Sequence, residues 1–165
     1  MTAPSTQLRR ALATGAALGL TLLATAPVAH AQDEVAAAAP ITVGLTVTGP
    51  AGVIIDTDIT TDGHTVSPAT GGAQLCDSTN NGANATPGAT PTAALDDAAT
   101  LHGFDWDGVW YPSFDDYLVT TIDGQSQTAD DFWLISVNGT ATAVGGCQHQ
   151  LSAGDQVDFT WTPVG

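Results

Sequence analysis

Acidic side chains are the most numerous titratable groups in this chain and the first to test for chemistry. They form three adjacent pairs: Asp96-Asp97, Asp115-Asp116 and Asp130-Asp131. Glycosidase-type catalysis needs two carboxyl groups across a cleft, one of them with a pKa raised by an apolar site. Because neighbouring residues of a strand point to opposite faces, a pair in the sequence is not a pair in space. We therefore interpret these pairs as solvated loop ends.

Other catalytic and metal-binding patterns are weak. Two Asp-containing stretches, 56–58 and 105–108, could ligate calcium, but neither has the spacing of an EF-hand or its closing Glu. The chain has no G-x-S-x-G motif for a serine nucleophile, and His64, His102 and His149 lack the spacing of a metal site. We expect no catalytic residues, no metal and no cofactor. An ordered calcium site and a hydrolase of unknown type are the alternatives.

Aromatic residues give a stronger indication of function. Several lie together between residues 106 and 114, and Phe132-Trp133 follows. Alternation along a strand turns some of these rings outward, and exposed aromatic rings suit a flat apolar ligand, a sugar face or a partner protein. We name Trp110, Tyr111 and Trp133 as candidate ligand-binding residues. The alternative is that these rings fill the core of a small domain.

The charge composition excludes several classes of partner. The chain has 17 Asp and Glu residues against 2 Lys and Arg, and its formal net charge is −15. Both basic residues, Arg9 and Arg10, lie near the N-terminus. The rest of the chain therefore has no basic patch for nucleic acid, no phosphate-binding lysine and no attraction to anionic lipid headgroups.

Residues 1–31 have the features of a secretory signal peptide. Arg9-Arg10 precede an apolar stretch, and Ala29-His30-Ala31 fits a cleavage site. The apolar stretch is short and rich in Ala, Gly and Thr, which disfavours a membrane anchor. We expect a secreted protein, exported by the general secretory or the twin-arginine route. Residues 32–40 would be a flexible lead-in to a single domain, 41–165, whose partner is an extracellular protein or a small apolar or planar ligand.

Two cysteines, Cys76 and Cys147, are the only ones in the chain. In an oxidising compartment a disulfide between them is the default expectation. The alternative is a metal-binding or nucleophilic thiol beside His149, but a reactive thiolate needs a neighbouring cation or base. The disulfide would pin the long segment 67–89, which is rich in Gly, Asn, Ser, Thr and Pro. A loop of that length is either functional or disordered.

The pattern of apolar residues predicts one helix among six to eight strands. Thr90 is a suitable N-cap, Pro91 suits the first helical position, and Gly103 suits the end of the helix. Asp123-Gly124 and Asn138-Gly139 are typical of tight hairpin turns. Strands are predicted at 41–47, at 53–55 and 59–66 with a break at Asp56 and Asp58, and at 117–122, 132–137, 140–144 and 157–161. This is an α+β pattern, a sheet with a helix on one face.

The C-terminal two-thirds of the chain resembles the transcobalamin-like C-terminal domain. The resemblance rests on the Thr-initiated helix 90–99, on the sequences VTTIDG, FW and VNG that follow it, and on 151–157 with the closing Trp161. The opening segment, 41–55, is consistent with the first hairpin of that family. His149 stands where the family commonly has Tyr, and Cys147 replaces a small residue.

This resemblance implies a small extracellular module with a mixed sheet and one packed helix, similar to β-grasp domains. In cobalamin carriers the domain covers one face of the corrin, and a separate helical barrel supplies most of the site. The bacterial members mostly lack assigned functions. We therefore expect a non-enzymatic binding module. The alternatives are an accessory domain that needs a partner domain to bind cobalamin or another small ligand, and an uncharacterised hydrolase.

Overall fold

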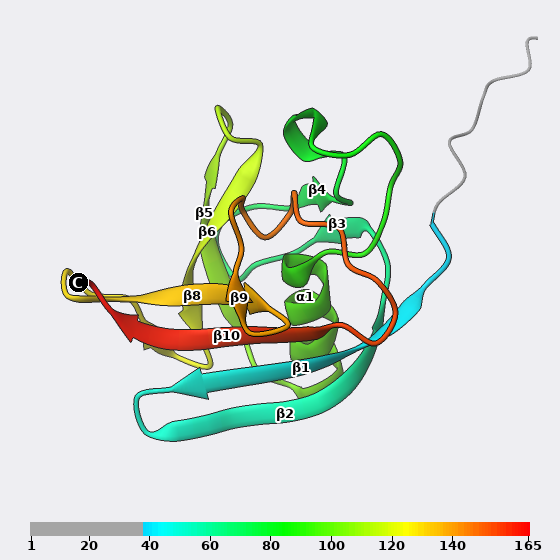
Figure 1. The fold of residues 1–165 in the computed structure, drawn as a ribbon. Helices are drawn as coiled ribbons and strands as arrows, with labels where there is room; N and C mark the ends of the chain where they lie inside the picture. The colour runs from blue at the N-terminus through cyan, green and yellow to red at the C-terminus, as the bar shows by residue number, and fades with distance from the viewer. Residues whose placement is uncertain (1–37) are drawn as a thin grey trace, which may run out of the picture. The chain divides into compact units, whose positions relative to one another are not determined.

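The computed structural model describes residues 38–165 (Figure 1). The predicted signal peptide, residues 1–31, lies outside the described residues, as does most of the lead-in 32–40. Among the described residues, no helix has the length and apolar character needed to cross a membrane.

A five-stranded sheet with the strand order β2-β1-β10-β8-β9 forms one side of the domain (Figure 1). β1 and β10 pair in parallel, whereas the other neighbours pair antiparallel, so the sheet is mixed. Alternate residues of β1 are buried, as expected for a strand with one face on the core. The strands are β1 (Ile41–Gly49), β2 (Gly52–Thr61), β8 (Asp131–Val137), β9 (Thr140–Ala141) and β10 (Gln156–Pro163).

One helix, α1 (Pro91–His102), begins and ends where the sequence predicts. The Thr90 hydroxyl accepts a hydrogen bond from the Ala93 backbone N–H at 3.2 Å, and Gly103 adopts the left-handed conformation, with φ 74°, that ends the helix. The buried face of α1 is made mostly of alanine. These small side chains let the helix lie close to the strands, and α1 contacts β1, β2, β3 and β5.

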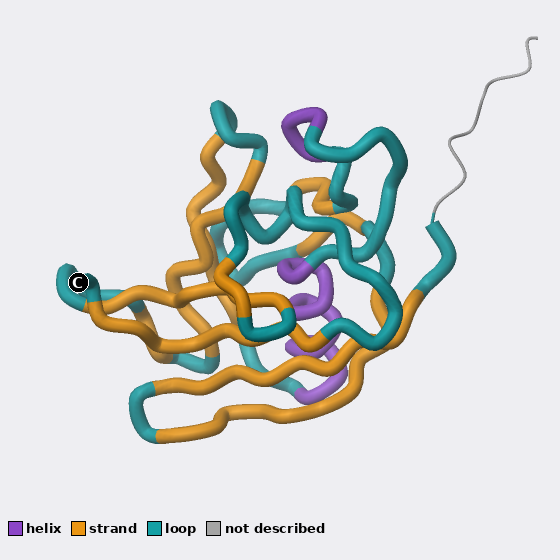
Figure 2. Tube along the Cα trace, viewed as in Figure 1, coloured by secondary structure: helices purple, strands orange, loops and turns teal. Residues whose placement is uncertain are grey.

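Two smaller sheets complete the fold, and loops connect them to α1 (Figure 2). Both turn dipeptides form the predicted hairpins, with positive φ at Asp123-Gly124 and at Asn138-Gly139. The α+β prediction is therefore confirmed for residues 38–165, which contain a mixed sheet and one α-helix. The remaining strands are β3 (His64–Val66), β4 (Gln74–Cys76), β5 (Trp106–Tyr111), β6 (Asp116–Ile122) and β7 (Gln125–Ser126).

The break predicted at Asp56 and Asp58 is wrong, because β2 continues through both residues. Both side chains are exposed, and β2 is an edge strand of its sheet. Charges on an edge strand are compatible with strand structure and also discourage pairing with another chain. The sequence shows that these two residues are charged, but it does not show that their side chains lie on an exposed face of an edge strand.

The predicted return strand 140–144 is shorter in the structure, since β9 ends at Ala141. The long segment 67–89 is ordered. It contains β4 and a 3₁₀ turn, η1 (Asn80–Gly82), and its backbone is held by side chains elsewhere in the fold. Thr70 N–H, for example, donates to the Asp107 carboxylate at 3.1 Å.

The predicted disulfide is confirmed. Cys76 on β4 and Cys147 in the loop before β10 are bonded, their Cα atoms are 4.6 Å apart, and both residues are fully buried. Ser78 N–H also donates to the Cys147 carbonyl at 3.1 Å. The disulfide therefore joins the 67–89 segment to the loop between β9 and β10.

Candidate functional site

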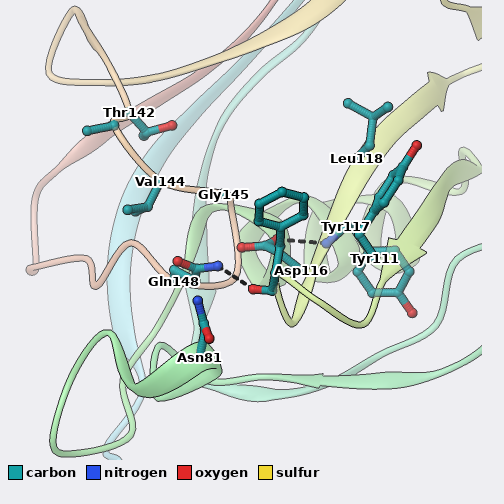
Figure 3. A pocket seen from close by; sticks show the side chains of 11 residues that line it. Asn81, Tyr111, Asp116, Tyr117, Leu118, Thr142, Val144, Gly145 and Gln148 are labelled. Atoms are coloured by element: carbon teal, nitrogen blue, oxygen red, sulfur yellow. Dashed lines mark hydrogen bonds between the residues drawn. The ribbon is translucent and has the colours of Figure 1, made fainter.

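A groove of about 560 Å³ lies where the β5–β6 hairpin, η1 and the loop after β9 meet (Figure 3). We call this cavity the groove throughout. Its volume is within the range of small-ligand sites. The residues that line it are Asn81, Tyr111, Phe114, Asp116, Tyr117, Leu118, Thr142, Ala143, Val144, Gly145 and Gln148.

The wall of the groove is apolar and exposed. Tyr111, Phe114, Leu118 and Val144 all present large side chains to solvent, and Phe114 is 62% exposed. The rings of Tyr111 and Phe114 meet edge to face, with centroids 6.3 Å apart. Scattered exposed apolar residues are ordinary, but a group of them around a concave surface is typical of a binding site.

A buried carboxylate, that of Asp116, is one of the polar groups that line the groove. Asp116 is 4% exposed, and it accepts hydrogen bonds from Tyr117 N–H at 2.7 Å and Cys147 N–H at 3.1 Å. Burial raises the pKa of this carboxyl to about 6 despite these donors. The neighbouring Asp115 accepts from Asn81 N–H at 2.8 Å. Of these two acidic residues only Asp116 lines the groove, and the charge of Asp115 adds to the rise in its pKa.

Direct bonds hold the walls of the groove together. The Gln148 side-chain amide donates to the Phe114 carbonyl, which ties the loop after β9 to the β5–β6 hairpin (Figure 3). The Asn84 side chain donates to the Ser78 and Gln148 carbonyls, both at 2.9 Å. With the disulfide, these bonds connect all three segments that line the groove, so its shape is set before any ligand enters.

Of the three candidate ligand-binding residues, only Tyr111 lines the groove. Trp110 packs edge to face on Tyr117, with centroids 4.8 Å apart. Trp133 is 4% exposed, packs on Trp161 at 5.2 Å, and donates its indole N–H to the Gln125 carbonyl at 3.1 Å. The structure does not bring the three side chains together in one groove. A ligand-binding role for them stays a prediction.

Phe114 belongs to the same aromatic stretch as Tyr111, but Asn81 and the lining residues 142–148 come from segments far apart in the sequence, which is why the aromatic pattern did not find them. Asn81 follows Cys76 closely, however, and Gln148 is next to Cys147. A disulfide brings the neighbours of its cysteines together. The cysteine pair was therefore the signal in the sequence that could have pointed to this surface.

The interpretation of all three acidic pairs as solvated loop ends is wrong for two of them. Asp116 is buried in β6, as described above. Asp96 lies on α1, where its carboxylate accepts from Trp106 Nε1 at 2.7 Å and from Ser67 N–H at 3.0 Å. Each carboxylate has a hydrogen-bond donor in a distant segment, Cys147 N–H for Asp116 and Ser67 N–H for Asp96, so its environment has no local signal in the sequence. Asp130 is exposed, as expected of a loop end.

His64 is the cationic partner of the acidic residues on α1. Its Nε2 lies 3.4 Å from Asp96 Oδ2 and 3.9 Å from Asp97 Oδ1, and its Nδ1 lies 3.5 Å from Asp62 Oδ1. The hydrogen bond to Asp96 is the main cause that raises the pKa of His64 to about 9. The imidazole is therefore protonated at neutral pH, and the cluster forms a partly buried ion pair.

This ion pair makes the stability of the fold depend on pH. Because the folded-state pKa is raised from 6.5 to about 9, the contribution of His64 is complete below pH 6.5 and is lost as the pH rises through 9. After allowance for solvent screening we expect a loss of about 1–2 kcal/mol. Urea unfolding at pH 6 and pH 10 measures it. His64→Gln should remove this part of the pH dependence, and His102→Gln, at an exposed position, should not. Equal pH dependence in wild type and His64→Gln would contradict the assignment.

Asp107, in one of the two stretches considered for calcium, has a structural role. Its carboxylate accepts from the backbone N–H groups of Thr70, Gly71 and Gly108 at 2.9–3.1 Å. Within residues 38–165, no group of three or more His, Cys, Asp or Glu side chains is placed to hold a metal ion.

Known proteins resemble this chain at the level of the fold. Residues 106–163, which run from β5 to β10, match the family described as "Domain of unknown function (DUF4430)". The structure is similar to the crystal structure of haptocorrin in complex with Cbi, with a TM-score of 0.50 and 14% sequence identity. That similarity covers 76% of this chain and 25% of the haptocorrin chain, so this chain spans about a quarter of that protein. No curated protein matches the chain. The two similarities support the predicted transcobalamin-like fold.

Proposed function

We propose that this protein is a secreted, non-enzymatic binding module that holds a small ligand with an apolar face in the groove. The observation that carries the proposal is the exposed apolar wall formed by Tyr111, Phe114, Leu118 and Val144 around a cavity of about 560 Å³. Exposing this surface costs solvation free energy, which a bound ligand would recover. The disulfide and the hydrogen bonds donated by the side chains of Gln148 and Asn84 fix the walls in advance, which lowers the entropic cost of binding.

The polar groups of the groove favour binding over catalysis. The Asp116 carboxylate accepts from backbone N–H groups, and the Tyr117 hydroxyl donates to the Gly72 carbonyl. Covalent catalysis needs a nucleophile within hydrogen-bond reach of a base, and no two side chains that line the groove form such a pair. The groove residues can position a ligand, and their hydrogen bonds already serve the fold.

A second candidate function is that of an accessory domain, β-grasp-like in arrangement, that binds cobalamin or another small ligand only with a partner domain. The observation that favours it is the haptocorrin similarity, which covers a quarter of a longer chain whose structure was solved with Cbi. In this case a second protein surface would cover the exposed wall of the groove.

The proposal is tested by titrating the purified protein with benzyl alcohol, a small neutral aromatic probe. NMR chemical shifts of the protein monitor the binding. Phe114→Ala should weaken binding about tenfold, because the variant removes a ring from the wall. Since Phe114 is 62% exposed, the variant should keep the fold. Leu101→Ala is the matched control, because Leu101 is 64% exposed but lies on α1, outside the groove.

Shifts confined to the groove and lost in Phe114→Ala would support the proposal. Equal effects of Phe114→Ala and Leu101→Ala would contradict it. A corrinoid difference spectrum that appears at micromolar concentration would favour the second candidate, particularly if it strengthens when a partner protein is added.

A further inference from the structure

The geometry points to an organic cation as the ligand of the groove, meaning a protonated or quaternary amine attached to an apolar body. This inference rests on the proposed function and further specifies that the ligand is positively charged. It is carried by the Asp116 carboxylate, which lines the groove together with three aromatic side chains, and by the nearby charge of Asp115. No Lys, Arg or His side chain lines the groove.

The first step concerns charge. Asp116 lines the groove and is 4% exposed, and Asp115 precedes it in the same hairpin. Their hydrogen-bond donors are neutral backbone N–H groups, from Tyr117 and Cys147 for Asp116 and from Asn81 for Asp115. These bonds orient the carboxylates without neutralising them. The raised pKa of Asp116 has burial as its main cause, and the charge of Asp115 adds to it.

No cation in the described part of the chain is placed to compensate these carboxylates. The chain has only 2 Lys and Arg residues, and both precede residue 11. His64 is paired with the acidic residues of α1, and no histidine lines the groove. Other proteins place Arg or Lys beside a buried carboxylate, because an isolated charge in an apolar site is costly. A cationic ligand would fill the same role here.

The second step concerns the walls. Three aromatic side chains line the groove: Tyr111, Phe114 and Tyr117. Figure 3 shows the Tyr111 ring and the Asp116 carboxylate among the side chains that line the groove, and the Phe114 ring meets the Tyr111 ring edge to face. The faces of aromatic rings carry negative electrostatic potential, and several rings around one space are the usual means of binding alkylated ammonium groups. Rings and carboxylates therefore favour the same sign of charge.

The third step excludes the other charged ligands. An anion in the groove would meet the Asp116 carboxylate and the nearby charge of Asp115, and no Lys, Arg or His side chain lines the groove to balance them. A small metal ion such as Ca²⁺ requires six to eight oxygen ligands, whereas this wall is formed largely by Tyr111, Phe114, Leu118 and Val144. An ammonium group with carbon substituents satisfies both parts of the groove, because its charge faces the carboxylates and its carbon atoms face the rings.

The test compares three aromatic probes of similar size with the purified protein by NMR titration: phenyltrimethylammonium, benzyl alcohol and benzenesulfonate. We expect the cation to bind about tenfold more tightly than the neutral alcohol, as a desolvated cation–π contact with a nearby carboxylate predicts. The anion should bind most weakly. All shifts should map to the groove.

Charge-removing variants identify the groups responsible. Asp116→Asn removes the negative charge that lines the groove. It also changes the group that accepts the hydrogen bond from the buried Cys147 N–H, so it disturbs the fold as well. Asp115→Asn is therefore the decisive variant: Asn tolerates the positive φ of 52° at this position and can still accept from Asn81 N–H. It should lower the preference for the cation about threefold. Asp58→Asn, an equal change of net charge on the exposed face of β2, should leave the preference unchanged.

The outcomes separate the two proposals. Equal affinities for the cation and the alcohol, or tighter binding of benzenesulfonate, would overturn the cation inference while leaving the groove as a binding site. An unchanged cation preference in Asp115→Asn, or an equal loss in Asp58→Asn, would also overturn it. If none of the three probes binds, the proposed function fails, and the inference fails with it.

Discussion

Replacing both Cys76 and Cys147 with serine is expected to lower the free energy of unfolding by about 4 kcal/mol. The disulfide closes a loop across a sequence separation of 71 residues, and a crosslink of that span removes much of the conformational entropy of the unfolded chain. Equilibrium unfolding in urea, monitored by tryptophan fluorescence, measures the loss. A domain of this size has a total stability of about 5–15 kcal/mol, so the effect is a large fraction of it.

The same variant should also weaken ligand binding in the groove, because the disulfide joins the segments that carry Asn81 and Gln148. Adding a reductant to the folded wild-type protein is the matched control. Both sulfurs are fully buried, so reduction should be slow until the protein unfolds. A double serine variant that unfolds at the same urea concentration as the wild type would show that the disulfide does not stabilise the fold.

Gly145→Ala is expected to destabilise the protein by about 2–3 kcal/mol and to abolish binding in the groove. An added Cβ at this position would overlap the Oδ2 and Cγ atoms of Asp116 and would lie 2.9 Å from its Oδ1. The carboxylate cannot turn away easily, because it accepts hydrogen bonds from the buried Cys147 N–H and from Tyr117 N–H. The fold would have to give up these bonds or displace the loop that forms one wall of the groove.

A double-mutant cycle with Asp116→Ala tests this explanation. Asp116→Ala should be destabilising by itself, because it leaves buried N–H groups without acceptors. In that background the Gly145→Ala substitution should cost much less than in the wild type, since the space of the carboxylate has been freed. Equal costs in the two backgrounds would mean that the strain at Gly145 does not come from Asp116.

The elements predicted correctly from the sequence are those specified by local chemistry. The helix begins at a hydroxyl cap followed by Pro91 and ends at Gly103, and each signal acts over a few residues. The hairpins at Asp123-Gly124 and Asn138-Gly139 form because these residues accept positive φ. The disulfide followed from the count of cysteines. None of these predictions required knowledge of which segments meet in space.

The errors concern residues whose environment is set by distant segments. Asp56 and Asp58 are accommodated because β2 lies at an edge of the sheet, and strand order is not a local property. Asp116 is buried and Asp96 is half-buried, and N–H groups from other segments donate hydrogen bonds to both carboxylates. The groove is assembled in the same way. Its aromatic wall was visible in the sequence, but Tyr111 alone of the candidate residues lines it.

The parallel pairing of β1 with β10 has a consequence for the order of events in folding. β1 lies beside β10, the central strand of the main sheet (Figure 1). In this pairing Leu45 is opposite Val157. The ribosome therefore releases the β1–β2 hairpin long before its central neighbour exists. Contacts between the two ends of a chain slow folding, because the intervening segment must be ordered first. Until β10 is made, the side of β1 that it covers therefore has unpaired backbone N–H and C=O groups, which are open to pairing with another chain.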